Sequence, residues 1–314
     1  MKDITSLLGI KYPIIQGAMA WIAEYNLASA VSEGGGLGII ASGSADVDWT
    51  RSQIRALREK TDKPFGVNIM MMNSATPDLM QLMIDEKVPV ITTGAGNPGK
   101  YISDLKAAGV IVIPVVAASA LAKRMEKAGA DAVIAEGCEA GGHIGEETTM
   151  SLLPQVVDAV SIPVIGAGGI GDGRGAAAAF MLGASGLQIG TRFLLAKETQ
   201  IAQAYKDKVI AAKDNSTTSI GRSTGHPVRQ LKNKMTKEVI SLEKVGIETE
   251  EFEKMMSGTL RMAVVDGDVD KGALMAGQIA GLVNKEQPAA EIIEEIMSDA
   301  RQIYSSLGGY LGGK

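Results

Sequence analysis

The sequence predicts an α/β protein, a (β/α)8 TIM barrel with a small, mainly helical cap inserted after the eighth strand. Eight short apolar runs alternate with segments of helical spacing over roughly the first 200 residues. The runs are apolar on both strand faces, which is typical of parallel strands covered on both sides. Glycine-rich turns follow the seventh and eighth runs, where TIM barrels commonly bind phosphate. An open, doubly wound sheet is the alternative, and it accounts less well for these two turns.

Local signals set the order of the elements. Proline in Thr76-Pro77-Asp78 suits the first turn of a helix, where its missing N–H costs nothing. Gly34-Gly35-Gly36 ends an earlier helix. The predicted strands cover residues 12–17, 37–41, 65–70, 88–93, 110–116, 131–135, 163–170 and 186–192. The predicted helices cover residues 27–31, 48–60, a segment beginning at 76, 100–108, 119–128, 151–160 and 175–182.

The strand-helix alternation ends after Ala196. We expect residues 197–270 to form the inserted cap, and residues 1–196 together with 271–307 to form the barrel. Small and apolar residues return at 272–283, which predicts the eighth barrel helix there. The glycine-rich tail, residues 308–314, is expected to be flexible.

The cap carries a cluster of positive charge. Residues 221–240 contain one anion, Glu238, and five cations, giving +4 in a chain of net charge −5: Arg222, Arg229, Lys232, Lys234 and Lys237. Binding of an acidic partner or a phosphate would explain the cluster, and so would an ordinary solvated helix face.

Composition limits the class of protein. With 46% hydrophobic and 21% charged residues, the 314-residue chain can bury a large core. No apolar run is long enough to span a membrane, and residues 1–5 do not resemble a signal peptide. The single cysteine, Cys138, excludes an internal disulfide framework and is expected to be a buried thiol. We therefore expect a cytoplasmic protein, and the net negative charge disfavours general nucleic-acid binding.

The strongest candidate for chemistry is the segment 135–145, where His143 lies among glycines directly after a predicted strand. A glycine-rich connection with a capping histidine is the simpler alternative. The second histidine, His226, lies in the cap, and without paired cysteines the two histidines predict no metal site. The candidate site has few acid-base groups of its own, because it consists of backbone amides, one imidazole and glycine turns. A bound cofactor is therefore expected to supply the chemistry. The turns after the last two strands would hold its phosphate.

Seven motifs, in order, resemble the flavin-dependent nitronate monooxygenase superfamily. Within that superfamily the chain is most similar to the bacterial FMN-dependent enoyl-acyl-carrier-protein reductases of type II. Residues 139–145 and Gly-His-Pro-Val-Arg at 225–229 carry the likeness to the reductase branch. The monooxygenases often have a lysine after the fifth strand. At the corresponding positions, residues 115–118, this chain has the sequence Val-Val-Ala-Ala, without a lysine. The seven motifs lie at residues 16–19, 34–38, 66–68, 139–143, 167–170, 188–193 and 276–278.

The resemblance implies FMN at the carboxyl ends of the barrel strands. The flavin ring would be contacted by Gly17, Ala18, Met19, Asn68, Glu136, Gly141 and Gly142, and closed in by Met275, Gly277 and Gln278. The phosphate would be held by Gly168, Gly169, Gln188, Gly190 and Thr191. His143 would be catalytic, stabilising the enolate formed by hydride addition or delivering a proton.

The resemblance also implies the reaction and its partners. NADH or NADPH would reduce the flavin, which would reduce trans-2-enoyl thioesters carried by acyl carrier protein, the last step of each fatty-acid elongation cycle. Dependence on a monovalent cation is a family trait without assignable ligands here, and a homodimer is an open expectation. The alternatives are a nitronate monooxygenase and a flavin-binding barrel without enzymatic activity.

Overall fold

The computed structural model describes residues 3–43 and 45–311. Its main sheet has eight parallel strands in the order β1-β9-β8-β6-β5-β4-β3-β2. A parallel bridge between Ile15 and Leu37 brings β1 beside β2, so the sheet closes into the predicted barrel. The strands are β1 (Ile14–Gln16), β2 (Gly38–Ala41), β3 (Phe65–Met70), β4 (Val90–Gly94), β5 (Ile111–Val116), β6 (Val133–Glu136), β8 (Val164–Ala167) and β9 (Gly186–Ile189).

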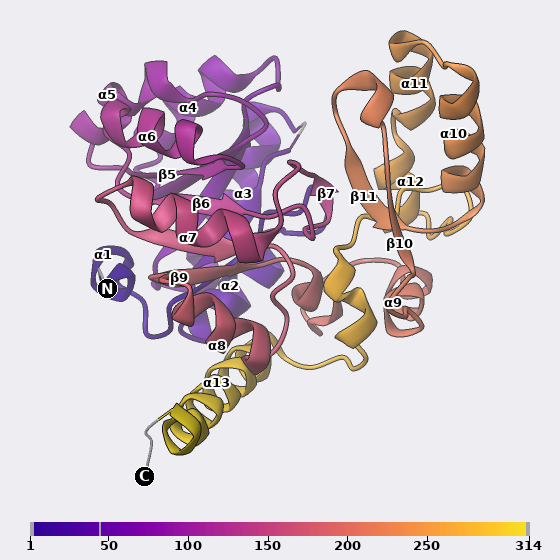
Figure 1. The fold of residues 1–314 in the computed structure, drawn as a ribbon. Coiled ribbons are helices and arrows are strands. Elements are labelled where there is room, and N and C mark those ends of the chain that lie inside the picture. Colours follow the sequence, from indigo (N-terminus) through magenta and orange to yellow (C-terminus); the bar gives the residue numbers. More distant parts are fainter. Residues whose placement is uncertain (1–2, 44, 312–314) are drawn as a thin grey trace.

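Helices cover the outside of the barrel (Figure 1). Helix α13 packs against α8 and α2, so it fills the place of the eighth barrel helix. The barrel helices are α2 (Tyr25–Glu33), α3 (Val47–Lys60), α4 (Thr76–Asp85), α5 (Gly99–Ala107), α6 (Ser119–Ala128), α7 (Thr149–Ala159), α8 (Gly173–Met181) and α13 (Ala289–Leu311). Residues 308–311 of the expected tail continue α13, and residues 312–314 lie outside the described residues.

Two hydrophobic layers hold the barrel together. The inner layer includes Ile39, Ile113 and Ile165 from the strands, and Ile4 and Leu8 of the short helix α1 (Ile4–Leu8) pack against them. The outer layer joins the other strand face to the surrounding helices. Because both strand faces are buried, the strands are continuously apolar, and this is the pattern that identified them in the sequence.

The prediction of a helix over residues 272–283 was wrong. This segment contains only the 3-10 helix η3 (Gln278–Leu282) and otherwise runs as an irregular strap beside the loop after β6. An added Cβ at Gly277 would lie 2.6 Å from the Glu139 carbonyl oxygen, and one at Gly281 would lie 2.9 Å from the backbone of Lys213. Glycine is therefore required for close backbone contact here rather than for helix packing.

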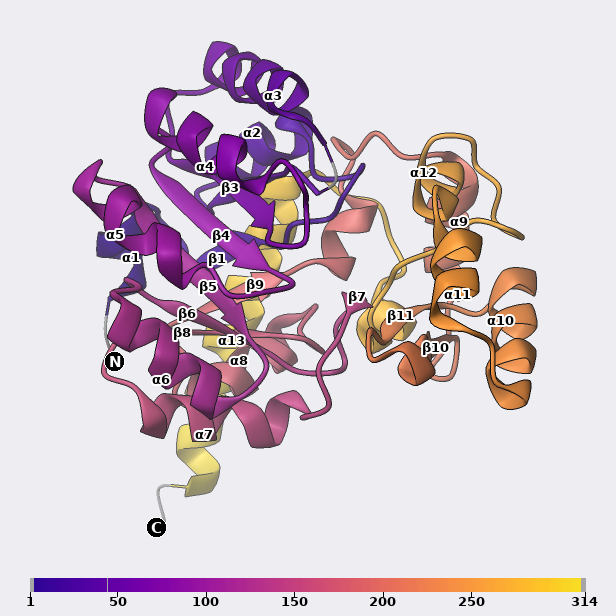
Figure 2. The same cartoon turned by 90° about the horizontal axis from the view of Figure 1, so that it is seen from above.

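The cap, residues 197–270, lies to one side of the barrel (Figures 1 and 2). It combines helices with a β-hairpin that the sequence analysis did not predict. Its elements are α9 (Gln203–Ile210), β10 (Thr217–Ile220), η2 (Arg222–Thr224), β11 (Val228–Leu231), α10 (Lys234–Val245), α11 (Thr249–Met256) and α12 (Thr259–Val264). The hairpin accepts a third strand, β7 (Gly142–His143), from the barrel loop after β6. One small sheet thus joins the cap to the barrel.

Within residues 3–43 and 45–311, no helix is long and apolar enough to cross a membrane.

Candidate functional site

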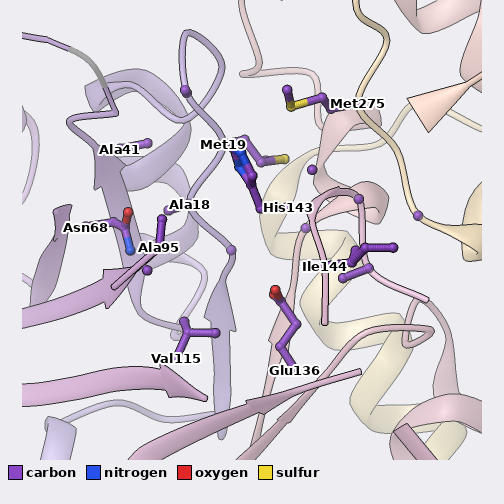
Figure 3. A pocket seen from close by; sticks show the side chains of 18 of the residues that line it. Ala18, Met19, Ala41, Asn68, Ala95, Val115, Glu136, His143, Ile144 and Met275 are labelled. Carbon is purple, nitrogen blue, oxygen red and sulfur yellow. The ribbon is translucent and has the colours of Figure 1, made fainter. Parts of the chain in front are cut away.

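A cavity of about 850 Å³ lies between the carboxyl ends of the barrel strands and the cap. This volume is within the range of sites that bind cofactors and small substrates. In Figure 3, Asn68, Ala95 and Val115 line one side of the cavity, while Ile144 and Met275 lie on the other. The side chains of Glu136 and His143 lie between them.

The structure brings the predicted site residues together with one exception. Gln278 does not line the cavity; its side chain is exposed and its amide donates to the Glu139 carbonyl oxygen at 2.9 Å. The residues that do line the cavity are Gly17, Ala18, Met19, Asn68, Glu136, Gly141, Gly142, His143, Gly168, Gly169, Gln188, Gly190, Thr191, Met275 and Gly277. Residues in or directly after five barrel strands, together with the loop after β6 and the strap, therefore form one site.

His143 is positioned by the cap. It lies on β7, which pairs antiparallel with β11, so that His143 is opposite Val228. The next amide, that of Ile144, donates to the Pro227 carbonyl oxygen at 3.0 Å. His143 lines the cavity. Withdrawal from bulk water lowers the pKa of His143, and the nearby His226 adds to the lowering. At neutral pH the imidazole is therefore mainly neutral, with one N–H to donate.

Glu136, at the end of β6, is a half-buried acid of the site. Burial raises the pKa of its carboxyl group to about 7. Because this value lies near neutrality, protonated and ionised forms are both present at physiological pH. The carboxyl group points into the cavity in Figure 3. It is thus a neutral hydrogen-bond donor for part of the time, unlike an exposed glutamate.

The loop after β6 is anchored at its second acid, Glu139. Its carboxylate accepts the Thr149 amide at 3.0 Å and the Thr149 hydroxyl at 3.0 Å, at the first turn of α7. An acidic side chain is favourable at a helix N-terminus, where backbone amides lack partners. The Thr149 hydroxyl also lies 2.9 Å from the Gly168 carbonyl oxygen. This contact ties the loop after β6 to the turn after β8.

Two glycine turns present unpaired amides to the cavity. Gly168 and Gly169 have φ values of 90° and 69°, which favour glycine. Among the described residues, the amides of Gly168, Gly169, Gly190 and Thr191 donate to no protein acceptor. A Cβ added at Gly190 would meet only the Met19 sulfur, at 3.9 Å, so the space before it is open. Such a cradle of unpaired amides suits a phosphate group.

Buried polar contacts hold two further parts of the wall. The Asn68 side-chain amide donates to the Thr92 hydroxyl at 2.9 Å, which fixes the plane of this side chain on β3. Tyr205 is fully buried, and its hydroxyl donates to the Met275 carbonyl oxygen at 2.7 Å. The Gly277 amide donates to the Thr191 hydroxyl at 2.9 Å. The strap is thereby fixed to both the cap and the barrel.

Several lining residues were not predicted. Ala95 lies between Gly94 and Gly96, and this glycine-rich turn after β4 was a signal that sequence reasoning could have used. Trp21 and Ala95 have positive φ values of 65° and 53°. Such backbone conformations are uncommon for non-glycine residues, and they occur more often at functional sites. Arg261 of α12 also lines the cavity, and no sequence motif marks it.

The positive residues of the cap are mostly engaged elsewhere. Arg229 is buried and donates to the Cys138 carbonyl oxygen at 2.9 Å. Arg222 pairs with Glu146 at 2.6 Å, and Lys234 pairs with Asp270 at 2.6 Å. None of these three cations lines the cavity. Cys138 itself is half-buried rather than buried as expected, and it forms no part of the cavity wall.

The chain is similar to known flavoenzymes over its whole length. A family model described as nitronate monooxygenase matches residues 2–299. FabK from Thermotoga maritima, an FMN-dependent enoyl-acyl-carrier-protein reductase, is 49% identical, with a TM-score of 0.96 over 99% of this chain and all of that one. Nitroalkane oxidase from Streptomyces ansochromogenes is 29% identical, with a TM-score of 0.88 over 98% of this chain and all of that one.

A relative of known sequence extends this set. The (3aS,4S,5R,7aS)-5-hydroxy-7a-methyl-1-oxo-octahydro-1H-indene-4-carboxyl-CoA dehydrogenase of Rhodococcus jostii is 34% identical over 97% of each chain. The chain therefore belongs to the nitronate monooxygenase family and is a FabK-like flavin oxidoreductase.

Proposed function

We propose that the chain reduces the C2–C3 double bond of trans-2-enoyl thioesters carried by acyl carrier protein, using FMN and either NADH or NADPH. The observation that carries this proposal is the 49% identity to FabK over 99% of the chain, with His143 facing a cavity large enough for cofactor and substrate. The Rhodococcus relative is named for a carboxyl-CoA compound, which is also a thioester. This name supports a thioester as the substrate class.

The cavity fits FMN. The unpaired amides of Gly168, Gly169, Gly190 and Thr191 would accept its phosphate, as helix N-termini and glycine turns do in other proteins. Asn68 and Glu136 would border its ring from β3 and β6. Bound FMN would supply hydride transfer, which protein side chains cannot perform. The remaining steps belong to the residues of the chain.

His143 would act on the thioester. Hydride addition at C3 places negative charge on the thioester oxygen, and a proton must then reach C2. Because its pKa is lowered, His143 is mainly neutral at pH 7, and its one N–H can donate a hydrogen bond to that oxygen. Glu136, with a pKa of about 7, holds a proton in the same cavity and can replenish one that is consumed.

Oxidation of nitronates is the second candidate. The nitroalkane oxidase of Streptomyces shares the fold and 29% of the sequence, so the family membership alone does not choose between the reactions. Steady-state assays of the FMN-loaded protein separate them. We expect oxidation of NADH or NADPH that depends on a crotonyl thioester. Oxygen consumption with a nitronate and no nicotinamide requirement would replace our proposal with the monooxygenase reaction.

A further inference from the structure

Arg261 is the cationic group of the cavity. Among the described residues that line the cavity, it is the one lysine or arginine, whereas Glu136 and Glu139 contribute acids. It lies on α12, the cap helix that also contributes Leu260 to the lining. Figure 2 shows α12 in the cap, to one side of the barrel. Arg261 therefore brings positive charge to the cap side of the site.

The guanidinium of Arg261 is available for a ligand. Its side chain is 51% exposed, and its nearest carboxylate, that of Asp266, is 3.4 Å away and 52% exposed. Exposed pairs of this kind contribute little free energy because water screens both charges. A ligand anion can therefore replace the Asp266 carboxylate beside Arg261 at a small cost in free energy. By contrast, Arg229 is buried against the Cys138 carbonyl and cannot turn toward the cavity without leaving that group unpaired.

A phosphate ester is the anion that fits this position. Under the proposed function, on which this inference rests, both substrates carry one: the phosphopantetheine arm of the carrier and the nicotinamide nucleotide. In each molecule the phosphate is separated from the reacting atoms by an organic arm. The reacting end belongs beside His143, so the phosphate belongs farther out, toward the cap. An arginine fork binds two phosphate oxygens in parallel, which lysine cannot do.

We propose that Arg261 binds the phosphate ester of a substrate arm at the cap side of the cavity. The test compares each phosphorylated substrate with its dephosphorylated form. One pair is crotonyl-phosphopantetheine and crotonyl-pantetheine, and the other is reduced nicotinamide mononucleotide and reduced nicotinamide riboside. Arg261→Ala and Arg261→Lys are measured as FMN-loaded enzymes. Lys234→Ala, which removes a cap cation that does not line the cavity, is the matched control.

For Arg261→Ala we expect KM to rise about 10- to 100-fold for the phosphorylated member of one pair, the usual loss for a charge-assisted hydrogen bond. KM for the dephosphorylated member should change less than about twofold. Arg261→Lys should lie between wild type and Arg261→Ala, and Lys234→Ala should resemble wild type. The pair that responds identifies the source of the phosphate. Equal changes within both pairs, or no change in either, would overturn the proposal.

A binding measurement keeps this proposal separate from the proposed function. Titration of phosphopantetheine, pantetheine and the oxidised forms of nicotinamide mononucleotide and nicotinamide riboside, followed by the flavin absorbance, measures binding without any hydride transfer. If wild type reduces no crotonyl thioester, the proposed function fails. In that case a preference for a phosphorylated compound that Arg261→Ala abolishes still supports the phosphate site. A preference that Arg261→Ala leaves intact, or the lack of any preference in wild type, refutes it.

Discussion

The Arg229 guanidinium donates a 2.9 Å hydrogen bond from Nε to the carbonyl oxygen of Cys138. In the pairing of β11 with β7, the same arginine lies opposite Gly142, which is the residue directly before His143. Arg229 is only 8% exposed, so this contact is made away from bulk water. The cap strand therefore holds both ends of the loop that carries the proposed catalytic imidazole, and Arg229 is a positioning residue.

Replacing Arg229 should loosen His143 while leaving the cofactor in place. Loss of a buried hydrogen bond to a charged group costs about 1.5–3 kcal/mol. For Arg229→Ala we expect kcat for enoyl reduction to fall about 10- to 100-fold, since 1.4 kcal/mol corresponds to a factor of ten. FMN content should match wild type, and Arg229→Lys should restore part of kcat. An unchanged kcat with a raised KM for acyl carrier substrate would instead support carrier recruitment by Arg229.

The turn after β8 gives a direct test of the phosphate cradle. At Gly168, where φ is 90°, an added Cβ would lie 2.7 Å from the Gly137 carbonyl oxygen. Gly168→Ala must therefore shift the turn, and we expect the affinity for FMN to fall at least about 10-fold, because the unpaired amides lose their alignment.

Gly246→Ala is the matched control for Gly168→Ala. Gly246 also has a positive φ, 86°, but nothing lies within 4 Å of its Cβ position, and it does not line the cavity. This change should cost about 1 kcal/mol of stability and leave FMN binding intact. Equal FMN affinities for the two variants, measured by equilibrium dialysis, would exclude the turn after β8 as the cradle.

Glu136 makes the stability of the FMN-free protein depend on pH. Its pKa is about 7 in the folded protein, against an ordinary value of 4.5. The folded state therefore binds the proton more tightly than the unfolded state, and stability falls as pH rises from about 4.5 to about 7. With about 1.4 kcal/mol for each pH unit, the total loss is roughly 3 kcal/mol.

Glu136→Gln removes this titration because glutamine stays neutral. Urea denaturation of the FMN-free proteins should give similar unfolding free energies at pH 4.5, whereas at pH 8 the variant should be more stable than wild type by roughly 3 kcal/mol. Parallel stability curves for the two proteins between these pH values would show that Glu136 titrates normally.

The role of His143 can be separated from its structure. Its backbone pairs with β11 and its side chain faces the cavity, so His143→Ala should fold and retain FMN. We expect kcat for crotonyl thioester reduction to fall by about 10²–10⁴, the usual contribution of a well-placed proton donor. Reduction of the flavin by NADH or NADPH should stay within a few-fold of wild type. Full enoyl turnover in this variant would make His143 a structural residue.

The sequence could identify the barrel because its strands are buried on both faces. Runs such as residues 110–116 are continuously apolar, and the structure places β5 within that range. The gathering of most of the proposed site residues around one cavity also followed from the sequence, because parallel strands bring all their exit turns to one end. The glycine turns after β8 and β9 therefore meet the segment of His143 even though more than 20 residues separate them in sequence.

Contacts between distant segments could not be predicted in this way. The partner of Arg229 is a backbone carbonyl 91 residues away, and that of Arg222 is a carboxylate 76 residues away. From the sequence alone these cations resemble a free basic surface. The strap was misassigned because Gly277 suits close backbone contact as well as helix packing. The hairpin of the cap is short, and polar and apolar residues do not alternate along β11. The hydrophobic pattern that usually marks a strand is therefore missing there.

An anaerobic half-reaction tests the proposed reductase activity most directly. The FMN-loaded protein is reduced with one equivalent of NADH or NADPH without oxygen, and crotonyl thioester is then added while the flavin absorbance is followed. The absorbance of oxidised flavin should return, with formation of one equivalent of butyryl thioester. Flavin that stays reduced with the thioester, but is reoxidised when oxygen is admitted, would contradict the assignment as an enoyl reductase.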